Sequence, residues 1–525
     1  MNKASFFAIF AAVMFWSNTS AAATPVLKCD TASLQAIAPA KTTITSVEQR
    51  SLPSSHCRVR GFVTNDSPGP NDSNFVLALP DAFAGRYLML NLGGNSGYVV
   101  DPENPAHNNQ SNGYPPQRLA EGFAFVSTDT GNQNPPLEYT FLGNRAKALD
   151  QAWRGTYSVA VATQAMTRAF YGAASMYRYA YGCSGGGRLG LATASVHPEI
   201  FDGTVAGAPA TFQVELAFAR VAQYLKRNPQ AWISPEQLAQ VQAAVLAKYD
   251  AADGAVDGMI WDPRVVKFDQ QLLPFLTPAQ VKFLQFARAD VVTPKGELVY
   301  RGYALTDDAS TVTWLTGKVP PDQWPSNEPL GWLLSVYFMK AFYDTNFDVV
   351  KDLDLNDQGQ TEFYLQYRNA VRWSAPGDKI AQAGLEGGQK IIVWVGVGDP
   401  AVSGANTIEL YKDTAKAVTD RNQRNRKGKR ADVQDFLRLY LAPGIGHCTG
   451  GPGPQDVQEN ALKAMIAWVE QGRSPTALVA SRKAQGALPD RSYLVCPYPQ
   501  QAAFSAVKGN DFNDASLWSC RPHYK

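Results

Sequence analysis

The stretch that decides the fold is Tyr181-Gly182-Cys183-Ser184-Gly185-Gly186-Gly187-Arg188. Its G-x-S-x-G pattern, residues 182–186, is typical of a nucleophile elbow, a sharp strand-to-helix turn that exposes a serine hydroxyl. Glycines suit this turn because a Cβ would obstruct both its backbone angles and the close approach of strand and helix. The aromatic run before it, residues 176–181, predicts a strand, and residues 188–196 predict a helix. A flexible loop can produce the same pattern, so the interpretation as an elbow depends on the predicted strand before it and the predicted helix after it.

The composition excludes several classes of protein. The chain has 525 residues, 45% hydrophobic and 18% charged, which fits a folded protein with one large domain plus an insertion or with two domains. A net charge of +2, without a basic run of the kind that binds nucleic acid, predicts no nucleic-acid partner. After the N-terminus no stretch has the apolar length of a membrane span, so no membrane partner is predicted. The sequence does not indicate the oligomeric state.

The N-terminus has the features of a secretory signal peptide. Lys3 supplies the positive charge, residues 6–16 form the apolar run, and Ala21-Ala22-Ala23 offer small residues to a signal peptidase. We therefore predict a signal peptide over residues 1–23 and export to the periplasm or the medium. A buried N-terminal helix is the alternative.

Six cysteines in an exported chain suggest disulfides. Proximity in the sequence favours pairing Cys29 with Cys57 and Cys496 with Cys520, which leaves Cys183 and Cys448. Free buried thiols are the alternative.

The order of the predicted elements divides the mature chain into a catalytic domain and an insertion. Residues 24–80 predict short strands and turns, and residues 81–210 alternate strands with helices, as in a mainly parallel sheet covered by helices. Residues 211–380 are irregular and rich in aromatic residues, which predicts an inserted lid domain. The alternation returns over residues 381–525. The predicted fold class is thus α/β, with residues 24–210 and 381–525 forming the catalytic domain.

Three residues that each follow a predicted strand have the chemistry of a catalytic triad: Ser184, Asp399 and His447. Serine is a poor nucleophile at neutral pH and needs a base to accept its proton, and the base needs a carboxylate to hold its tautomer. The order Ser, Asp, His along the chain is that of the α/β-hydrolases. Among the five histidines, His447 alone follows a late strand in a glycine-rich turn, whereas His197 ends the elbow helix and is interpreted as structural.

Two cysteines adjoin this triad. Cys183 precedes Ser184, and Cys448 follows His447. If Ser184 and His447 come within hydrogen-bond reach, the two cysteines come close enough for a disulfide. The pair left over from the cysteine spacing is thus the pair that the triad predicts.

A glycine-rich loop is a candidate for part of an oxyanion hole. The buried-type strand over residues 86–92 runs directly into Gly93-Gly94. Backbone N–H groups of such a loop, together with the N–H of Gly185 after the nucleophile, can point at a developing negative charge. A plain tight turn is the alternative.

An acidic loop follows the helix predicted over residues 235–249. Asp250, Asp253 and Asp257 lie within eight residues and would repel one another unless they are spread out or bind a cation. Oxygen-rich clusters of this kind suit Ca²⁺, although the spacing differs from that of an EF-hand. A solvated turn explains the spacing equally well.

At these residues the chain resembles the tannase and feruloyl esterase family. The motifs are Gly182-Cys183-Ser184-x-Gly186-Gly187-Arg188 and Gly446-His447-Cys448-x-Gly450-Gly451, with further matches at residues 127–131, 201–210, 398–400 and 496–499. The resemblance covers nearly the whole mature chain and implies an α/β-hydrolase fold with a lid between nucleophile and acid. Members include tannases, feruloyl esterases and mono(2-hydroxyethyl) terephthalate hydrolase, which cleave esters of small aromatic acids.

The resemblance also implies a calcium site on the acidic loop. The implied ligands are three carboxylates and two backbone carbonyls, from Asp250, Asp253, Asp257, Ala255 and Met259. Three positions depart from the family pattern: Tyr249 stands where a cysteine is usual, Gly185 where a larger residue is common, and Asn132 where a histidine is common.

The sequence therefore predicts an exported serine esterase that hydrolyses esters of hydroxycinnamic or related acids through an acyl-enzyme. Among the lid aromatics, we expect Trp332 and Phe338 to contact the aromatic ring of the substrate, and Arg368 or Arg372 is a candidate to bind a substrate carboxylate. A tannase or a terephthalate-monoester hydrolase is the alternative within the family. A catalytically inactive, calcium-dependent carbohydrate-binding protein is a rival of another class, and the intact Ser, Asp and His argue against it.

Overall fold

The computed structural model describes residues 23–109, 112–135, 137–211, 214–304, 308–325, 327–370, 372, 375–425, 430–486, 488–507 and 509–522. Except for Ala23, the predicted signal peptide lies outside these residues. None of the described helices is long and apolar enough to cross a membrane.

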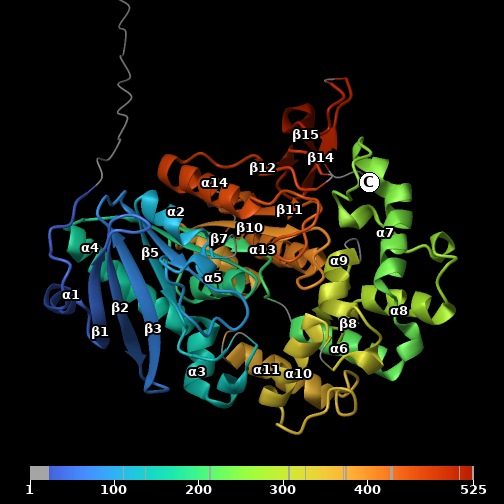
Figure 1. Cartoon of the computed structure of the whole chain (residues 1–525), viewed down its shortest axis with the longest axis horizontal. Helices are drawn as coiled ribbons and strands as arrows, with labels where there is room; N and C mark the ends of the chain where they lie inside the picture. Colours follow the sequence, from blue (N-terminus) through green and yellow to red (C-terminus); the bar gives the residue numbers. More distant parts are fainter. Residues whose placement is uncertain are drawn as a thin grey trace, which may run out of the picture.

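A nine-stranded mixed sheet organises the molecule, with the strand order β1-β2-β3-β5-β4-β6-β7-β10-β11 (Figure 1). Its parallel part consists of β5 (Phe123–Thr128), β4 (Arg86–Leu90), β6 (Tyr177–Cys183), β7 (Gly203–Gly207), β10 (Lys390–Gly396) and β11 (Leu437–Ala442). Its antiparallel edge consists of β1 (Thr42–Arg50), β2 (His56–Asn65) and β3 (Asn71–Pro80). The prediction of short strands for residues 24–80 was wrong, because the polar clusters there mark the ends of strands of nine or ten residues.

Alternate strand residues pack into separate cores on the two faces of the sheet. In β4, Leu88 belongs to a cluster with Leu119 of α2 (Pro115–Ala120) and Leu462 of α14 (Val457–Gln471). The next residue, Met89, belongs to a cluster with Val159 of α4 (Gly155–Tyr171) and with α1 (Thr31–Ile37). The helices α5 (Gly185–Val196), α12 (Gly377–Leu385) and α13 (Gly404–Arg424) pack with β10 and β11. This sequence of helices and strands confirms the predicted α/β class.

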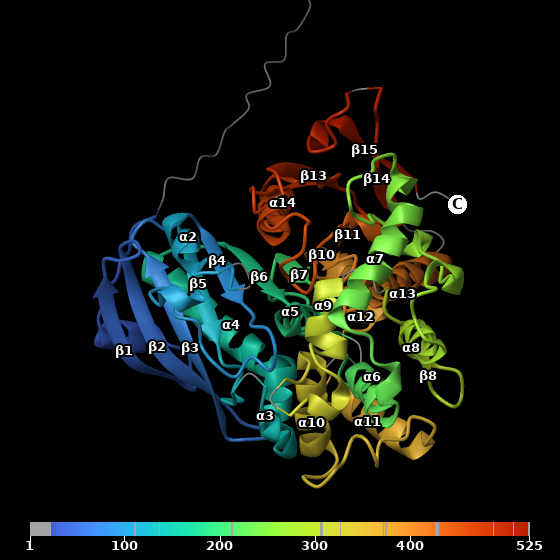
Figure 2. The same ribbon diagram turned by 45° about the vertical axis from the view of Figure 1, so that its right-hand side comes forward.

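The segment between β7 and β10 is mostly helical and forms a lobe beside the sheet (Figure 2). Before α12 leads back to the sheet, its helices are α6 (Val214–Arg227), α7 (Pro235–Tyr249), α8 (Pro278–Arg288), α9 (Asp308–Thr311), α10 (Leu330–Phe342) and α11 (Gln358–Ala370). Its only described strands are the short pair β8 (Val291–Val292) and β9 (Leu298–Tyr300). We call this segment the helical lobe; its role as a lid, and the boundaries 211–380, stay a prediction.

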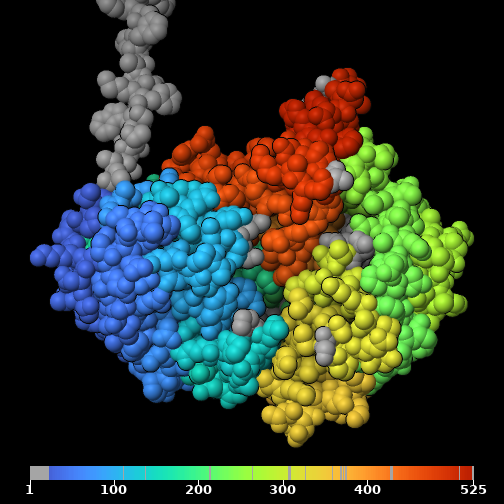
Figure 3. Space-filling model, viewed as in Figure 1, coloured from blue at the N-terminus to red at the C-terminus, as the bar shows by residue number. Residues whose placement is uncertain are grey.

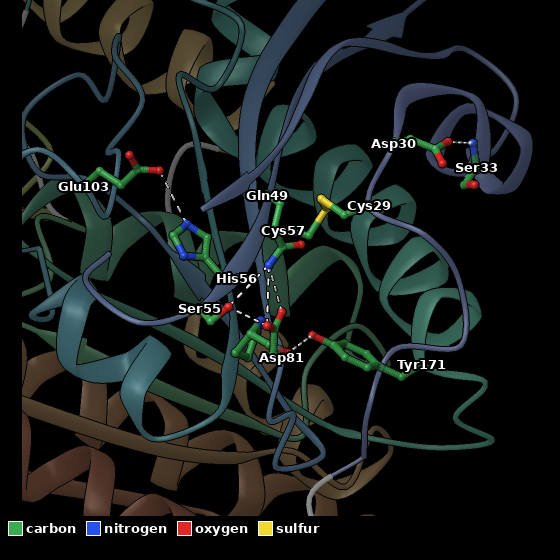
Figure 4. Close-up of a disulfide and its surroundings, with 11 residues drawn as sticks. Cys29, Asp30, Ser33, Gln49, Ser55, His56, Cys57, Asp81, Glu103 and Tyr171 are labelled. Carbon is green, nitrogen blue, oxygen red and sulfur yellow. Dashed lines mark hydrogen bonds and ion pairs between the residues drawn. A yellow bond between two sulfur atoms is a disulfide. The ribbon is translucent and has the colours of Figure 1, made fainter. Parts of the chain in front are cut away.

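Three disulfides join the six cysteines in the predicted pairs, Cys29–Cys57, Cys183–Cys448 and Cys496–Cys520. Figure 4 shows the first of them, which ties the segment before α1 to β2. The third lies in the C-terminal hairpins formed by β12 (Leu478–Arg482) with β13 (Arg491–Val495) and by β14 (Gln500–Phe504) with β15 (Trp518–Pro522).

Candidate active site

Ser184 occupies a strained turn between β6 and α5. Its backbone has φ 60° and ψ −124°, a region that residues other than glycine rarely adopt. Gly182 and Gly186 pass so close to Asn91 that a Cβ on either would overlap its carbonyl oxygen. The strand-to-helix elbow that the G-x-S-x-G pattern predicts is therefore present, and it holds the Ser184 hydroxyl at the carboxyl end of the parallel strands.

Asp399 and His447 approach Ser184 from the loops after two neighbouring strands, β10 and β11. His447 Nε2 lies 2.8 Å from Ser184 Oγ, and His447 Nδ1 lies 2.9 Å from Asp399 Oδ2. Asp399 Oδ1 accepts hydrogen bonds from the backbone N–H groups of Ala401, at 2.8 Å, and Val402, at 2.9 Å. A carboxylate oxygen accepts hydrogen bonds, so His447 donates its Nδ1–H to Asp399 and has a lone pair on Nε2 that can accept the serine proton.

The Cys183–Cys448 disulfide joins the positions next to Ser184 and His447. Its Cα atoms are 6.1 Å apart, and it closes a loop of 265 residues. Both half-cystines are buried and border the cavity described below. The disulfide thus links the end of β6, which carries the nucleophile, to the loop that carries the imidazole.

The loop after β4 lies against the start of α5. A Cβ on Gly185 would overlap the carbonyl oxygen of Gly94, and a Cβ on Gly93 would lie 3.9 Å from the Cβ of Ser184. Gly185 is the first residue of α5, where the N–H has no partner within the helix. The three glycines therefore lie together beside Ser184 at the cavity, and their role as an oxyanion hole stays a prediction.

A cavity of about 360 Å³ opens beside Ser184 and His447, where Figure 3 shows a hollow between the N-terminal half, the helical lobe and the C-terminal part. The Trp314 ring meets the imidazole of His447 edge-on, with centroids 4.8 Å apart, and stacks on Phe218 at 5.8 Å. Burial raises the pKa of Tyr98 and of Tyr139, so both phenols stay protonated at neutral pH. The polar side chains of the lining belong to Asn112, Gln151, Arg188 and Glu215.

The two aromatic residues expected to contact the substrate lie elsewhere. Trp332 packs against Trp324 in the helical lobe, and Phe338 is buried behind Tyr139, with ring centroids 5.3 Å apart. Neither borders the cavity, because Trp332 packs within the lobe and Phe338 packs between the lobe and Tyr139. From that helix, Leu334 borders the cavity instead. The sequence contains no local signal that separates Trp314, which borders the cavity, from Trp332, which does not.

Of the two arginines considered for a substrate carboxylate, one is placed by the structure, and it lies away from the cavity. Arg372 borders a different hollow, together with Pro376 and Lys379. The side chain of Arg368 lies outside the described residues. Among the described residues, the arginine that borders the cavity is Arg188, in the first turn of α5. The only sequence signal for Arg188 is its position at the end of the elbow motif.

The acidic loop after α7 forms a compact turn held by its own carboxylates. Asp253 Oδ1 accepts the N–H of Ala255 at 3.0 Å, and Asp257 Oδ1 accepts the N–H of Met259 at 3.1 Å. Asp250 accepts two further N–H groups of the loop, at 3.1 and 3.0 Å. The backbone of the five predicted ligand residues is thus wrapped around three buried or half-buried carboxylates.

The charge of this loop is only partly balanced. Asp257 pairs with the buried Arg491 at 2.5 Å. Burial, with the nearby Asp257 and Asp250 carboxylates, raises the pKa of Asp253 to about 8. In the part of the chain that the structure describes, no three acidic, histidine or cysteine side chains are arranged to hold a metal ion. The donor set, oxygen atoms with excess negative charge, fits the chemistry of Ca²⁺.

The chain is similar to known esterases over most of its length. A family model described as "Tannase and feruloyl esterase" matches residues 57–311 and 377–520. An uncharacterised esterase of Xanthomonas campestris is 31% identical over 452 residues, covering 77% of this chain and 75% of the relative. The mono(2-hydroxyethyl) terephthalate hydrolase of Piscinibacter sakaiensis is 25% identical over 544 aligned positions, covering 89% of this chain and 84% of the relative.

Among solved structures, feruloyl esterase B from Aspergillus oryzae has a similar fold. The TM-score is 0.77 at 22% sequence identity, and the match covers 94% of this chain and 99% of that chain. With the strand order above, this likeness confirms the predicted α/β-hydrolase fold.

Proposed function

Since this chain belongs to the tannase and feruloyl esterase family, we propose that it is an exported serine esterase that hydrolyses esters of small aromatic acids, feruloyl esters among them. The observation that carries the proposal is the hydrogen-bonded series Ser184, His447, Asp399 at the border of a cavity lined by aromatic rings. Membership of the family makes the protein a carboxylic ester hydrolase; the acyl-enzyme route and the acid released are the proposal.

The reaction proceeds in two acyl-transfer steps. His447 Nε2 takes the Ser184 proton as Oγ attacks the ester carbonyl, and Asp399 stabilises the imidazolium that forms. The N–H of Gly185, with that of Gly93 or Gly94, stabilises the negative oxygen of the tetrahedral intermediate. The imidazolium then protonates the leaving alcohol, and water activated by the same imidazole releases the acid from Ser184.

The cavity accounts for the choice of an aromatic acyl group. Four aromatic rings line the same cavity as Ser184 and offer flat faces and edges to an aromatic acyl group: Trp314, Phe218, Tyr98 and Tyr139. Because Trp314 and Phe218 belong to the helical lobe, the lobe acts as a lid that supplies one wall of the substrate site. The relative that hydrolyses a terephthalate monoester favours that ester as the second candidate substrate, and a tannase activity is the third.

Calcium and export complete the proposal. Asp250, Asp253 and Asp257 would hold Ca²⁺ through carboxylates, and Ala255 and Met259 through backbone carbonyls; the cation would neutralise the excess charge of the loop. Three disulfides are typical of proteins folded in an oxidising compartment, which supports export behind the predicted signal peptide.

Steady-state kinetics of the mature protein on methyl ferulate, methyl gallate and mono(2-hydroxyethyl) terephthalate test the proposal. We expect turnover of at least one ester, with kcat/KM highest on the true acyl group, and no turnover by Ser184→Ala with an unchanged circular dichroism spectrum. Full activity of Ser184→Ala would refute the mechanism. Zero turnover on all three esters, combined with calcium-dependent glycan binding, would instead support the rival carbohydrate-binding function.

A further inference from the structure

We propose that Gln151 is a positioning residue that fixes the two halves of the oxyanion hole relative to each other; this inference rests on the proposed esterase function. One half is the Gly93–Gly94 loop after β4, and the other is the start of α5 at Gly185. These halves come from segments that are far apart in the chain, and the catalytic chemistry requires their N–H groups to converge on one oxygen atom.

The Gln151 side chain reaches both halves. Its Nε2 donates to the carbonyl oxygen of Asn95 at 3.3 Å, one residue after Gly94. Its Oε1 accepts a hydrogen bond from Arg188 Nη2 at 3.2 Å, on the first turn of α5. Arg188 also donates to the backbone carbonyl oxygens of Gln151, at 3.4 Å, and Ala152, at 3.2 Å. One amide therefore connects the loop that carries one oxyanion donor to the helix that carries the other.

The orientation of this amide is determined by its partners. A carbonyl oxygen accepts and a guanidinium donates, so only one of the two amide orientations satisfies both contacts. Gln151 and Asn95 are buried, at 0% and 1% exposure, and Arg188 is 2% exposed. At this depth water cannot replace a lost contact freely, so a missing bond leaves an unsatisfied polar group.

Neighbouring contacts hold Asn95 in the same place. Its carbonyl oxygen also accepts from Asn132 Nδ2, and its own Nδ2 donates to the carbonyl of Pro135 at 2.7 Å. Asn132 in turn accepts the N–H of Asn134 at 2.9 Å. The hydrogen bonds described for Asn132 thus stay within the neighbouring loops, whereas Gln151 joins the loop to the nucleophile helix.

The backbone around Gln151 is unusual. Residues Asp150–Arg154 form a π-helical turn between α3 (Arg145–Leu149) and α4, a feature that occurs often at functional sites and redirects the side chains that follow. Gln151 also borders the cavity, so the hydrogen bonds that it makes to Asn95 and Arg188 lie beside the substrate site. Without these two hydrogen bonds, both halves of the oxyanion hole keep their N–H groups but hold them in looser alignment. We expect this to lower kcat by about 10- to 100-fold.

The test compares Gln151→Met with a matched control, Gln164→Met. Gln164 is a second buried glutamine, 3% exposed, whose Nε2 donates to the carbonyl of Ile200 at 3.1 Å, far from the elbow. Both variants lose a buried amide of the same size, so the comparison separates the loss of a buried amide from the loss of the link to the elbow. We expect Gln151→Met to lose about 10- to 100-fold in kcat on methyl ferulate with KM within about threefold, and Gln164→Met to keep wild-type kinetics.

A second readout does not depend on the natural substrate. A p-nitrophenyl alkylphosphonate phosphonylates Ser184 Oγ, and the phosphonyl oxygen of the adduct occupies the oxyanion hole, so the inactivation rate constant should fall in parallel with kcat. Gln151→Glu keeps an acceptor for Arg188 but turns an oxygen toward Asn95, and we expect it to be as slow as Gln151→Met.

The outcomes distinguish the two proposals. Equal kcat and inactivation rates in Gln151→Met and Gln164→Met, or wild-type rates in Gln151→Glu, would overturn the positioning role. A wild type that turns over none of the esters but reacts with the phosphonate would overturn the proposed substrate class, while the inactivation rates still decide the role of Gln151.

Discussion

Opening the disulfide beside the active site should cost both stability and activity. The variant Cys183→Ala/Cys448→Ala releases a loop of 265 residues. In the chain-entropy description, a cross-link that closes so long a loop stabilises the folded state by about 5.5 kcal/mol. The unfolding entropy of a chain of 525 residues is about 2 cal/mol/K per residue, so this loss lowers the melting temperature by about 5 °C. The Ser184–His447 contact also loses its covalent tether, which we expect to lower kcat about tenfold.

The matched control is Cys29→Ala/Cys57→Ala, which opens a loop of 28 residues that contains α1 and β1; neither cysteine borders the cavity. The same description assigns it about 3.5 kcal/mol, or a fall of about 3 °C, and no change in kcat. Thermal melts followed by circular dichroism, and kcat on the preferred ester, are measured for both variants without reductant. A wild-type kcat in the active-site variant, or a melting temperature no lower than that of the control, would refute the reasoning.

Three further predictions follow from the cavity, the acidic loop and a buried carboxyl. Trp314→Ala removes the ring that contacts the imidazole and is expected to raise KM and lower kcat by about tenfold each, whereas Trp332→Ala leaves both within about twofold; similar kinetics of the two variants would contradict the assignment of the cavity wall. If free calcium exceeds its Kd by about a thousandfold before chelation, we expect EGTA to lower the melting temperature of the wild type by about 4 °C. EGTA should not change the melting temperature of Asp253→Asn. Equal shifts in the two proteins would exclude the proposed cation site. Burial raises the pKa of Asp129 to about 6, so the folded state binds a proton at this carboxyl more tightly than the unfolded chain does. As the pH rises from about 4 to about 6, the folded state loses up to about 3 kcal/mol of stability because this proton dissociates. Thermal melts of the wild type and Asp129→Asn across that range measure the difference, and parallel curves would contradict it.

The residues brought together at the elbow were predictable from local sequence alone. Ser184, Asp399 and His447 each follow a buried strand, and parallel strands present their carboxyl ends at one edge of a sheet. That rule places the three side chains near one another without any knowledge of the helices. The pairing of Cys183 with Cys448 then follows from adjacency in the chain, which is why a long-range contact could be predicted here.

The walls of the cavity were not predictable, and the reason is physical. Trp314 and Trp332 both lie in helical stretches of the inserted segment, and which ring faces the cavity depends on how the helical lobe docks on the sheet. Gln151 falls in residues 146–171, whose sequence has helical character but does not mark a change of helix type. The structure has a π-helical turn there, and a one-residue insertion of this kind leaves no signature in the spacing of apolar residues.

The helical lobe contacts the catalytic base as well as bordering the cavity. Trp314 lies at the same time against the imidazole of His447 and against Phe218 of α6. A lobe that shifts to admit a bulkier acyl group therefore also moves the ring that packs on the catalytic base. Acyl selectivity in this protein should consequently appear in kcat as well as in KM, because a substrate that displaces Trp314 loosens the base that must deprotonate Ser184.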